Sequence, residues 1–96
     1  MGLGLAAVTP DIRHEYGLNN NLNGVLITKV DPDSDAADKG LQTGDVVLTI
    51  ANRPVHTPQD VKALIAAAHA QGRSTVLMLV AGNGGQRYIA LKIGQG

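Results

Sequence analysis

The chain has 96 residues, a formal net charge of zero and a hydrophobic fraction of 44%, which fits one globular domain with a modest core. Eight basic residues balance eight acidic ones, which argues against a polyanion or an anionic membrane surface as partner. The two aromatic residues are both Tyr and give no platform for nucleic-acid bases, and the absence of Cys excludes disulfides and thiolate chemistry.

The N-terminal segment is apolar and contains glycine. It has no basic start and Pro10 interrupts it early, so it does not fit an export signal. No apolar run approaches the length of a membrane span. We expect any targeting signal to lie outside this sequence, Met1 to be a start added to an excised domain, and Gln95–Gly96 to be a tail.

The first half of the chain predicts two strands and two short helices. Leu3–Thr9 forms a strand that Pro10 ends, and Thr9 then caps a short helix that stops at Gly17. The remaining elements are a turn at Asn19–Gly24, a strand at Val25–Val30 and a short helix at Asp33–Lys39.

The second half predicts three strands and one long helix. A strand at Val46–Ile50 is followed by a proline turn at Asn52–Pro54. The long helix covers Pro58–Gln71, with Thr57 as its N-cap. The last two strands, Ser74–Ala81 and Arg87–Ile93, are joined by a hairpin loop at Gly82–Gly85.

These elements predict a mainly β fold, in which five or six strands form a partly open barrel with one long helix and two shorter ones. Alternation along the strands indicates which side chains face the core. The expected core positions, or the alternate positions of the same strands if the register differs, are Val25, Ile27, Val46, Leu48, Ile50, Val76, Met78 and Val80.

Three aspartates at alternate positions, beginning at Asp31, invite a calcium interpretation. That interpretation fails because Ala36 stands where an EF-hand loop needs Gly, and Gln42 stands where it needs a bidentate Glu. We therefore interpret the aspartates as a solvated acidic helix start. The three His residues lie in different elements and neither Ser lies in a nucleophile motif. The sequence thus predicts no catalytic residue, no metal and no cofactor.

The stretch Ala36–Val55 runs in the order helix, glycine, turn, strand and proline turn. It resembles the middle of a PDZ domain of the bacterial HtrA/Deg-type serine proteases. Gly2-Leu3-Gly4-Leu5 resembles the GLGF loop of that family, and the segment Thr9–Leu18 is also typical of it. Ala51-Asn52 stands where the family often has Asn-Gly, and we expect the turn to survive because Asn tolerates a left-handed conformation.

The resemblance covers essentially the whole chain and implies a single PDZ domain over residues 1–96. It also implies the permuted bacterial strand order, in which the C-terminal strand takes the place of a strand that precedes the GLGF loop in animal PDZ domains.

The resemblance also implies a site. A peptide adds as a strand to Leu5–Val8, its carboxylate is held by backbone N–H groups of the Gly4 loop, and the long helix covers its other side. Val61 is then the first groove position, which implies apolar side chains at the peptide end and two residues before it. Leu64 and Ala67 are expected to face the core. The expected site residues are Leu3, Gly4, Leu5, Ala6, Ala7, Val8, Val61, Ile65 and Ala68.

The implied function is binding of C-terminal or unfolded polypeptide segments with apolar ends, without catalysis in this chain. The parent is then a periplasmic serine endopeptidase whose protease domain lies outside the sequence; neither nucleic acid nor a membrane span is involved. Two alternatives stay open. The parent is a C-terminal processing protease, a membrane metalloprotease or a secretion component, or the groove is unused and the domain is an oligomer-assembly contact.

Overall fold

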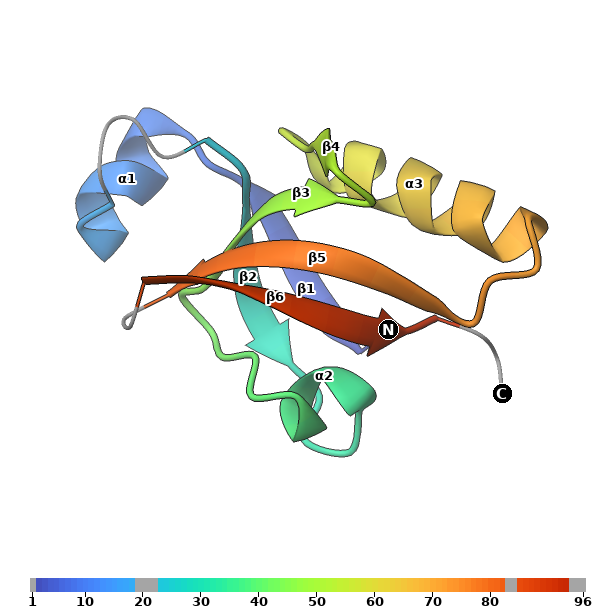
Figure 1. Cartoon of the computed structure of the whole chain (residues 1–96). Coiled ribbons are helices and arrows are strands. Elements are labelled where there is room, and N and C mark those ends of the chain that lie inside the picture. Colours follow the sequence, from blue (N-terminus) through green and yellow to red (C-terminus); the bar gives the residue numbers. More distant parts are fainter. Residues whose placement is uncertain (1, 19–22, 83–84, 94–96) are drawn as a thin grey trace.

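The computed structural model describes residues 2–18, 23–82 and 85–93, which form one open antiparallel sheet with three helices (Figure 1). The strands follow the order β1-β2-β3-β5-β6, and β4 pairs with β3. The elements are β1 (Leu3–Ala7), α1 (Pro10–Tyr16), β2 (Val25–Val30), α2 (Asp35–Asp38), β3 (Val46–Ile50), β4 (Arg53–Pro54), α3 (Pro58–Ala70), β5 (Thr75–Gly82) and β6 (Gly85–Lys92).

The predicted mainly β, partly open fold is therefore confirmed, with the C-terminal strand β6 paired to β5 at one edge. The long helix ends one residue earlier than expected, and the β3–β4 connection contains a two-residue strand that the sequence did not indicate. Several expectations concern residues outside the described part of the chain: Met1, the turn at 19–22, residues 83–84 of the hairpin loop, and the tail.

Aliphatic side chains fill the core, as the near absence of aromatic residues requires. Seven of the eight expected core residues are at most 4% exposed. The exception is Leu48, which is half-buried because the pairing of β3 with β5 shifts register between Val47 and Thr49. The seven are Val25, Ile27, Val46, Ile50, Val76, Met78 and Val80.

The two-residue connection between β3 and β4 keeps its turn. Ile50 pairs with Arg53, while Ala51 and Asn52 both have positive φ, of 52° and 66°. Positive φ at both central positions is the geometry of a type I′ hairpin, which explains why Asn is accepted at the second position.

The start of α3 is fixed by reciprocal hydrogen bonds. The Thr57 hydroxyl accepts from the backbone N–H of Asp60 at 3.1 Å, and the Asp60 carboxylate accepts from the backbone N–H of Thr57 at 3.2 Å. The same carboxylate accepts from the N–H of His56 at 2.9 Å. This cap sets where α3 begins along the sheet.

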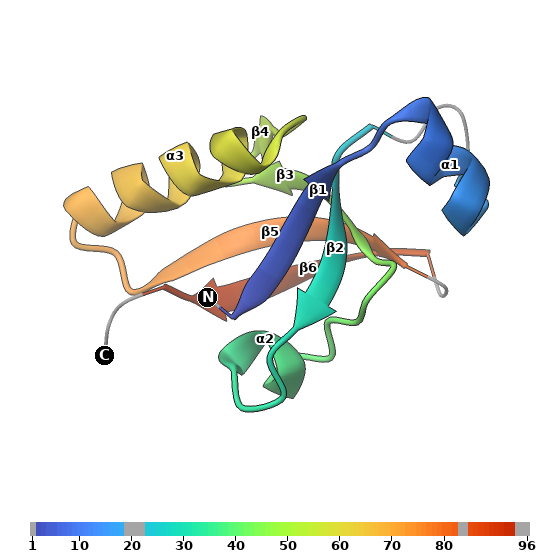
Figure 2. The same ribbon diagram turned by 180° about the vertical axis from the view of Figure 1, so that it is seen from behind.

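The two edges of the sheet differ in what covers them. At β6, the Lys92 N–H donates to the Asp35 carboxylate at 2.9 Å, and Lys39 donates to the Ala90 carbonyl at 3.2 Å. Both partners belong to α2 or its C-cap, so polar side chains close this end of the edge. In the described chain β1 pairs only with β2, and its other edge lies along α3 (Figure 2).

We expect the Asp60 cap to give acid-dependent stability. The hydrogen bond from His56, followed by those from Thr57, lowers the pKa of Asp60 below its ordinary value of 3.8. A lowered pKa in the folded state stabilises the fold above the unfolded pKa, and this contribution disappears as the pH falls through the folded pKa. Asp60→Ala should therefore lower the melting temperature near neutral pH, by a difference that shrinks below about pH 4.

Circular dichroism melts between pH 3 and 7 measure this difference. Gln59→Ala is the control, because it changes a neighbouring exposed side chain of the same turn that does not titrate. A difference between wild type and Asp60→Ala that stays constant across the series would contradict the assignment.

Candidate functional site

A groove of about 520 Å³ lies between β1 and α3. Leu3 and Leu5 of β1 line one side, and Ile93 joins them from beyond the end of β6. The other side is α3, which contributes Lys62, Ile65, Ala66, His69 and Ala70. The open strand edge and an apolar depression therefore occur at the same place.

The first glycines of the chain are needed for packing within the domain. A Cβ on Gly4 would lie 2.9 Å from the Thr28 hydroxyl and 3.0 Å from the Lys29 Cβ. Gly2 has φ +74°, and a Cβ there would lie 2.6 Å from the Cβ of Ser34. Between Gly4 and Leu5 the register with β2 shifts, so this end of β1 departs from a regular ladder.

The structure corrects the expected rotation of α3. Val61 is fully buried and Ala68 is 6% exposed, and neither lines the groove. Ala67, expected in the core, is exposed. Ile65 lines the groove as expected, and Leu64 packs against the core. Successive residues are about 100° apart around a helix. The helix residues that line the groove therefore lie about one position later in the chain than the positions predicted from the sequence.

Three groove residues of α3 were missed: Lys62, Ala66 and His69. They follow the spacing i, i+4 and i+7, which places them on one face of the helix. In the sequence only this helical spacing pointed to the three residues. Because Lys62 and His69 are polar, the set does not look like the apolar face of a groove. Ile93 carried no local signal, because it reaches the groove only through the pairing of β6 with β5.

The remaining expected residues are placed by β1. Ala6 and Ala7 belong to the strand, opposite Leu26 and Val25, but their side chains do not line the groove. Val8 lies one residue beyond the end of β1.

The groove has an apolar floor and two polar side chains, Lys62 and His69. Among the described residues, no Asp or Glu lines this groove. Within the described ranges no three His, Cys, Asp or Glu residues lie close enough to hold a metal ion together, and none of the helices is both long and apolar enough to cross a membrane. Asp31 accepts from the N–H of Asp33 at 3.0 Å, so this aspartate organises the turn before α2.

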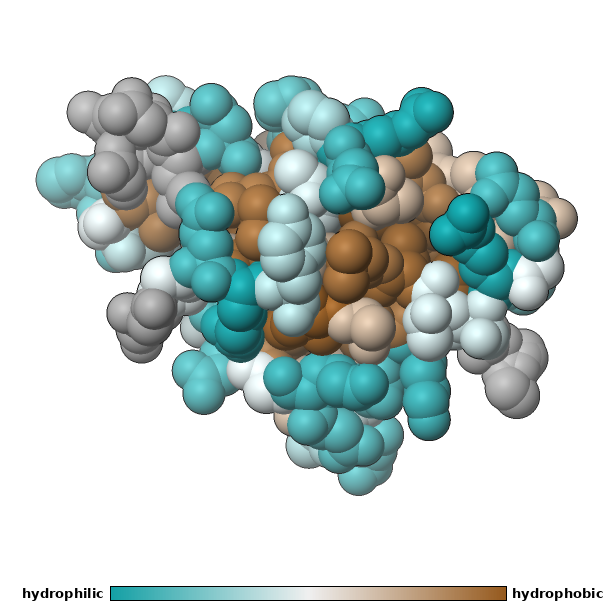
Figure 3. Space-filling view, viewed as in Figure 1, coloured by the Kyte–Doolittle hydropathy of each residue, from teal (hydrophilic) through white to brown (hydrophobic). Residues whose placement is uncertain are grey.

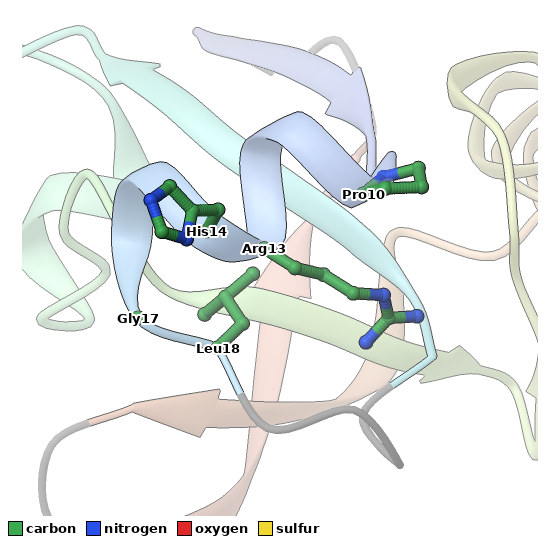
Figure 4. A pocket seen from close by; sticks show the side chains of 5 residues that line it. All are labelled: Pro10, Arg13, His14, Gly17 and Leu18. Carbon is green, nitrogen blue, oxygen red and sulfur yellow. The ribbon is translucent and has the colours of Figure 1, made fainter.

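A separate hollow lies beside α1 and is lined by Pro10, Arg13, His14, Gly17 and Leu18 (Figure 4). The Arg13 guanidinium donates to the Asn23 side-chain oxygen at 3.1 Å, which ties α1 to the segment before β2. Figure 4 shows the Arg13 and His14 side chains pointing in different directions. Their polar groups do not converge, so this hollow lacks the geometry of a polar ligand site.

Comparisons with known proteins agree with this architecture. The sequence profile of the family described as "PDZ domain" matches residues 26–81. A probable periplasmic serine endoprotease DegP-like from Brucella suis is 46% identical over 84 residues, which cover 83% of this chain and 16% of that protein. The magnetosome formation protease MamE from Magnetospirillum gryphiswaldense is 44% identical over 64 residues, which cover 64% of this chain and 8% of that protein. The chain thus spans a small part of these relatives.

Solved structures share the fold. The HtrA3 PDZ domain bound to a phage-derived ligand (FGRWV) superposes with a TM-score of 0.76 at 20% identity, covering 96% of this chain and 81% of that one. The HtrA-type protease AlgW with a decapeptide gives a TM-score of 0.75 at 25% identity, covering 95% of this chain and 27% of that one.

The rotation of α3 is tested by two neighbouring substitutions. Val61→Ala removes two methyl groups from a fully buried position and should lower the free energy of unfolding by about 2 kcal/mol. Lys62→Ala, on the exposed groove face, should change it by less than about 0.5 kcal/mol. Urea unfolding followed by circular dichroism measures both. Equal losses, or a larger loss for Lys62→Ala, would contradict the observed rotation.

Proposed function

Because the chain belongs to the PDZ domain family, we propose that it is a non-catalytic module that binds an extended peptide along β1, in the groove between β1 and α3. The observation that carries this proposal is the contrast between the two edges of the sheet. At one end of the β6 edge, Asp35 of α2 and its C-cap Lys39 bond backbone groups of Lys92 and Ala90, whereas the β1 edge borders an apolar groove. An added strand obtains main-chain hydrogen bonds from such an edge and side-chain contacts from the groove.

We propose that the peptide runs antiparallel to β1. A peptide antiparallel to β1 has its C-terminus beside Leu3 and Gly4, where backbone N–H groups would receive the carboxylate. Its last side chain would pack against Leu3, Leu5, Ile65 and Ile93, which favours an apolar residue at the end. The HtrA3 PDZ domain and AlgW carry peptides in their solved structures, which supports the proposal by relation.

The preference at the peptide residue two positions before the end depends on which residue of α3 it meets. Val61 would have favoured an apolar side chain there, whereas the groove presents Lys62. Lys62 and Ala66 are four residues apart, about 6 Å along the helix axis, close to the roughly 6.6 Å between alternate side chains of a strand. When the terminal side chain lies beside Ala66, the side chain two residues earlier lies beside Lys62. We therefore propose a carboxylate-bearing residue at that earlier position.

We further propose that the parent is a periplasmic serine endoprotease and that this domain presents polypeptide segments to it. The relatives from Brucella and Magnetospirillum are named as proteases, and the Brucella protein is named as periplasmic. These names favour this parent over a C-terminal processing protease or a secretion component. The peptide experiments below also decide whether the groove binds peptide at all or serves only as an assembly contact.

The first binding experiment compares a fluorescein-labelled peptide ending in Leu-Val with the same peptide amidated at its C-terminus. We expect a Kd in the micromolar range, a clear loss on amidation, and loss of binding in Ile65→Asp. Fluorescence anisotropy measures affinity, and circular dichroism verifies that the variant is folded. Equal affinity of the acid and the amide would instead indicate recognition of internal segments, and unchanged binding by Ile65→Asp would refute the groove assignment.

A second experiment compares Glu with Gln two residues before the peptide end. Lys62 makes no ion pair with another described residue, so a peptide carboxylate should gain roughly 2- to 5-fold in affinity over the amide. Lys62→Ala should remove this difference while leaving the Gln peptide almost unaffected. A Glu preference that survives in Lys62→Ala would show that another group recognises the carboxylate.

A further inference from the structure

We propose a second binding site on the other side of α3, for a segment of another protein that carries a large apolar side chain between carboxylates. A hollow of about 500 Å³ lies between α3, β5 and the β3–β4 turn. It shares no lining residue with the β1 groove, so one helix separates two independent depressions. The proposal does not depend on the function proposed for the β1 groove.

The floor of this hollow is apolar. Val76 of β5 is 4% exposed and lies at the bottom, while Leu64 and Ala67 of α3 form one wall. Leu77 also lines the hollow and is 43% exposed. In the view of Figure 1, β5 runs in front of the molecule, and Figure 3 shows exposed apolar surface over this strand, which borders the hollow.

The rim of the hollow is cationic. Arg53 of β4 and Arg73, beyond the end of α3, both line it and are exposed. In the described part of the chain the ion pairs involve Arg87 and Lys39, and neither rim arginine takes part in one. No Asp or Glu lines the hollow. Two guanidinium groups beside an apolar floor complement a segment that presents carboxylates next to a Leu-sized side chain.

A second copy of this chain offers two acidic stretches. In the first, Asp11 and Glu15 flank Ile12, but the basic Arg13 and His14 stand between the two acids, which disfavours contact with a cationic rim. The second and densest is Asp31–Asp38, which contains four aspartates but only alanines and a proline as apolar residues. Asp35 is moreover already bonded to Lys92 within the domain. Neither Ala36, which is fully buried, nor Ala37 could fill the hollow above Val76. The complementary partner is therefore another polypeptide.

The probe is an acetylated and amidated peptide with the core Glu-Leu-Leu-Glu, which has no terminal carboxylate for the β1 groove. Two-dimensional NMR of the labelled chain locates its site. We expect amide shifts at Ala67, Gln71, Arg73 and Leu77, without matching shifts at Leu5 or Ile65. The peptide with Lys in place of both Glu residues is the control and should bind clearly more weakly.

The variants separate the two faces of α3. Arg53→Gln combined with Arg73→Gln should weaken the Glu peptide by roughly 3- to 10-fold, whereas Lys62→Gln on the opposite face should not. Leu77→Ser should weaken it as well, and spectral dispersion verifies folding. The proposal would be overturned if the shifts were confined to the β1 groove, if only Lys62→Gln lost binding, or if the Lys peptide bound equally well. Self-association in place of peptide binding, or the absence of shifts at millimolar peptide, would overturn it as well.

Discussion

The burial of Val61 and Ala68 fixes the rotation of α3, and both depressions of the molecule depend on it. These two side chains face the core, so Lys62, Ala66 and His69 are directed to the β1 groove. On the opposite side of the buried stripe, Leu64 and Ala67 border the second hollow. The burial of these two side chains thus positions every residue of α3 that the proposed sites use.

The two edges of the sheet are protected to different degrees. An antiparallel sheet that does not close has two edges, and each exposes backbone groups able to pair with another strand. Here α2 covers part of the β6 edge through Asp35 and Lys39, which use charged side chains to bond backbone groups. The backbone N–H and C=O groups at the β1 edge lie next to an apolar groove. Selective protection of the β6 edge favours the β1 edge for the strand addition proposed above.

The two depressions of the domain have similar linings, which combine aliphatic and basic side chains. The β1 groove combines aliphatic surface with Lys62 and His69, and the second hollow combines aliphatic surface with Arg53 and Arg73. Both lack acidic lining residues, although the whole chain has equal numbers of acidic and basic residues. The acids are instead used locally, as in the α3 cap and the turn before α2. This division of charge leaves both depressions suited to apolar segments with carboxylates.

The sequence by itself determined the helices and every strand except the two-residue β4, because their signals are local: a Thr-Pro start for α1 and α3, glycines after helices, and alternating aliphatic residues in strands. The resemblance to PDZ domains also located β1 and α3 as the walls of the groove. Tertiary structure alone decided the rotation of α3, since an alanine-rich helix with apolar residues at 61, 64, 65 and 68 fits several rotations. It also decided the half-burial of Leu48, through a register shift, and the placement of Arg53 and Arg73 around one hollow. Those outcomes depend on contacts between residues far apart in the chain, which no local pattern records.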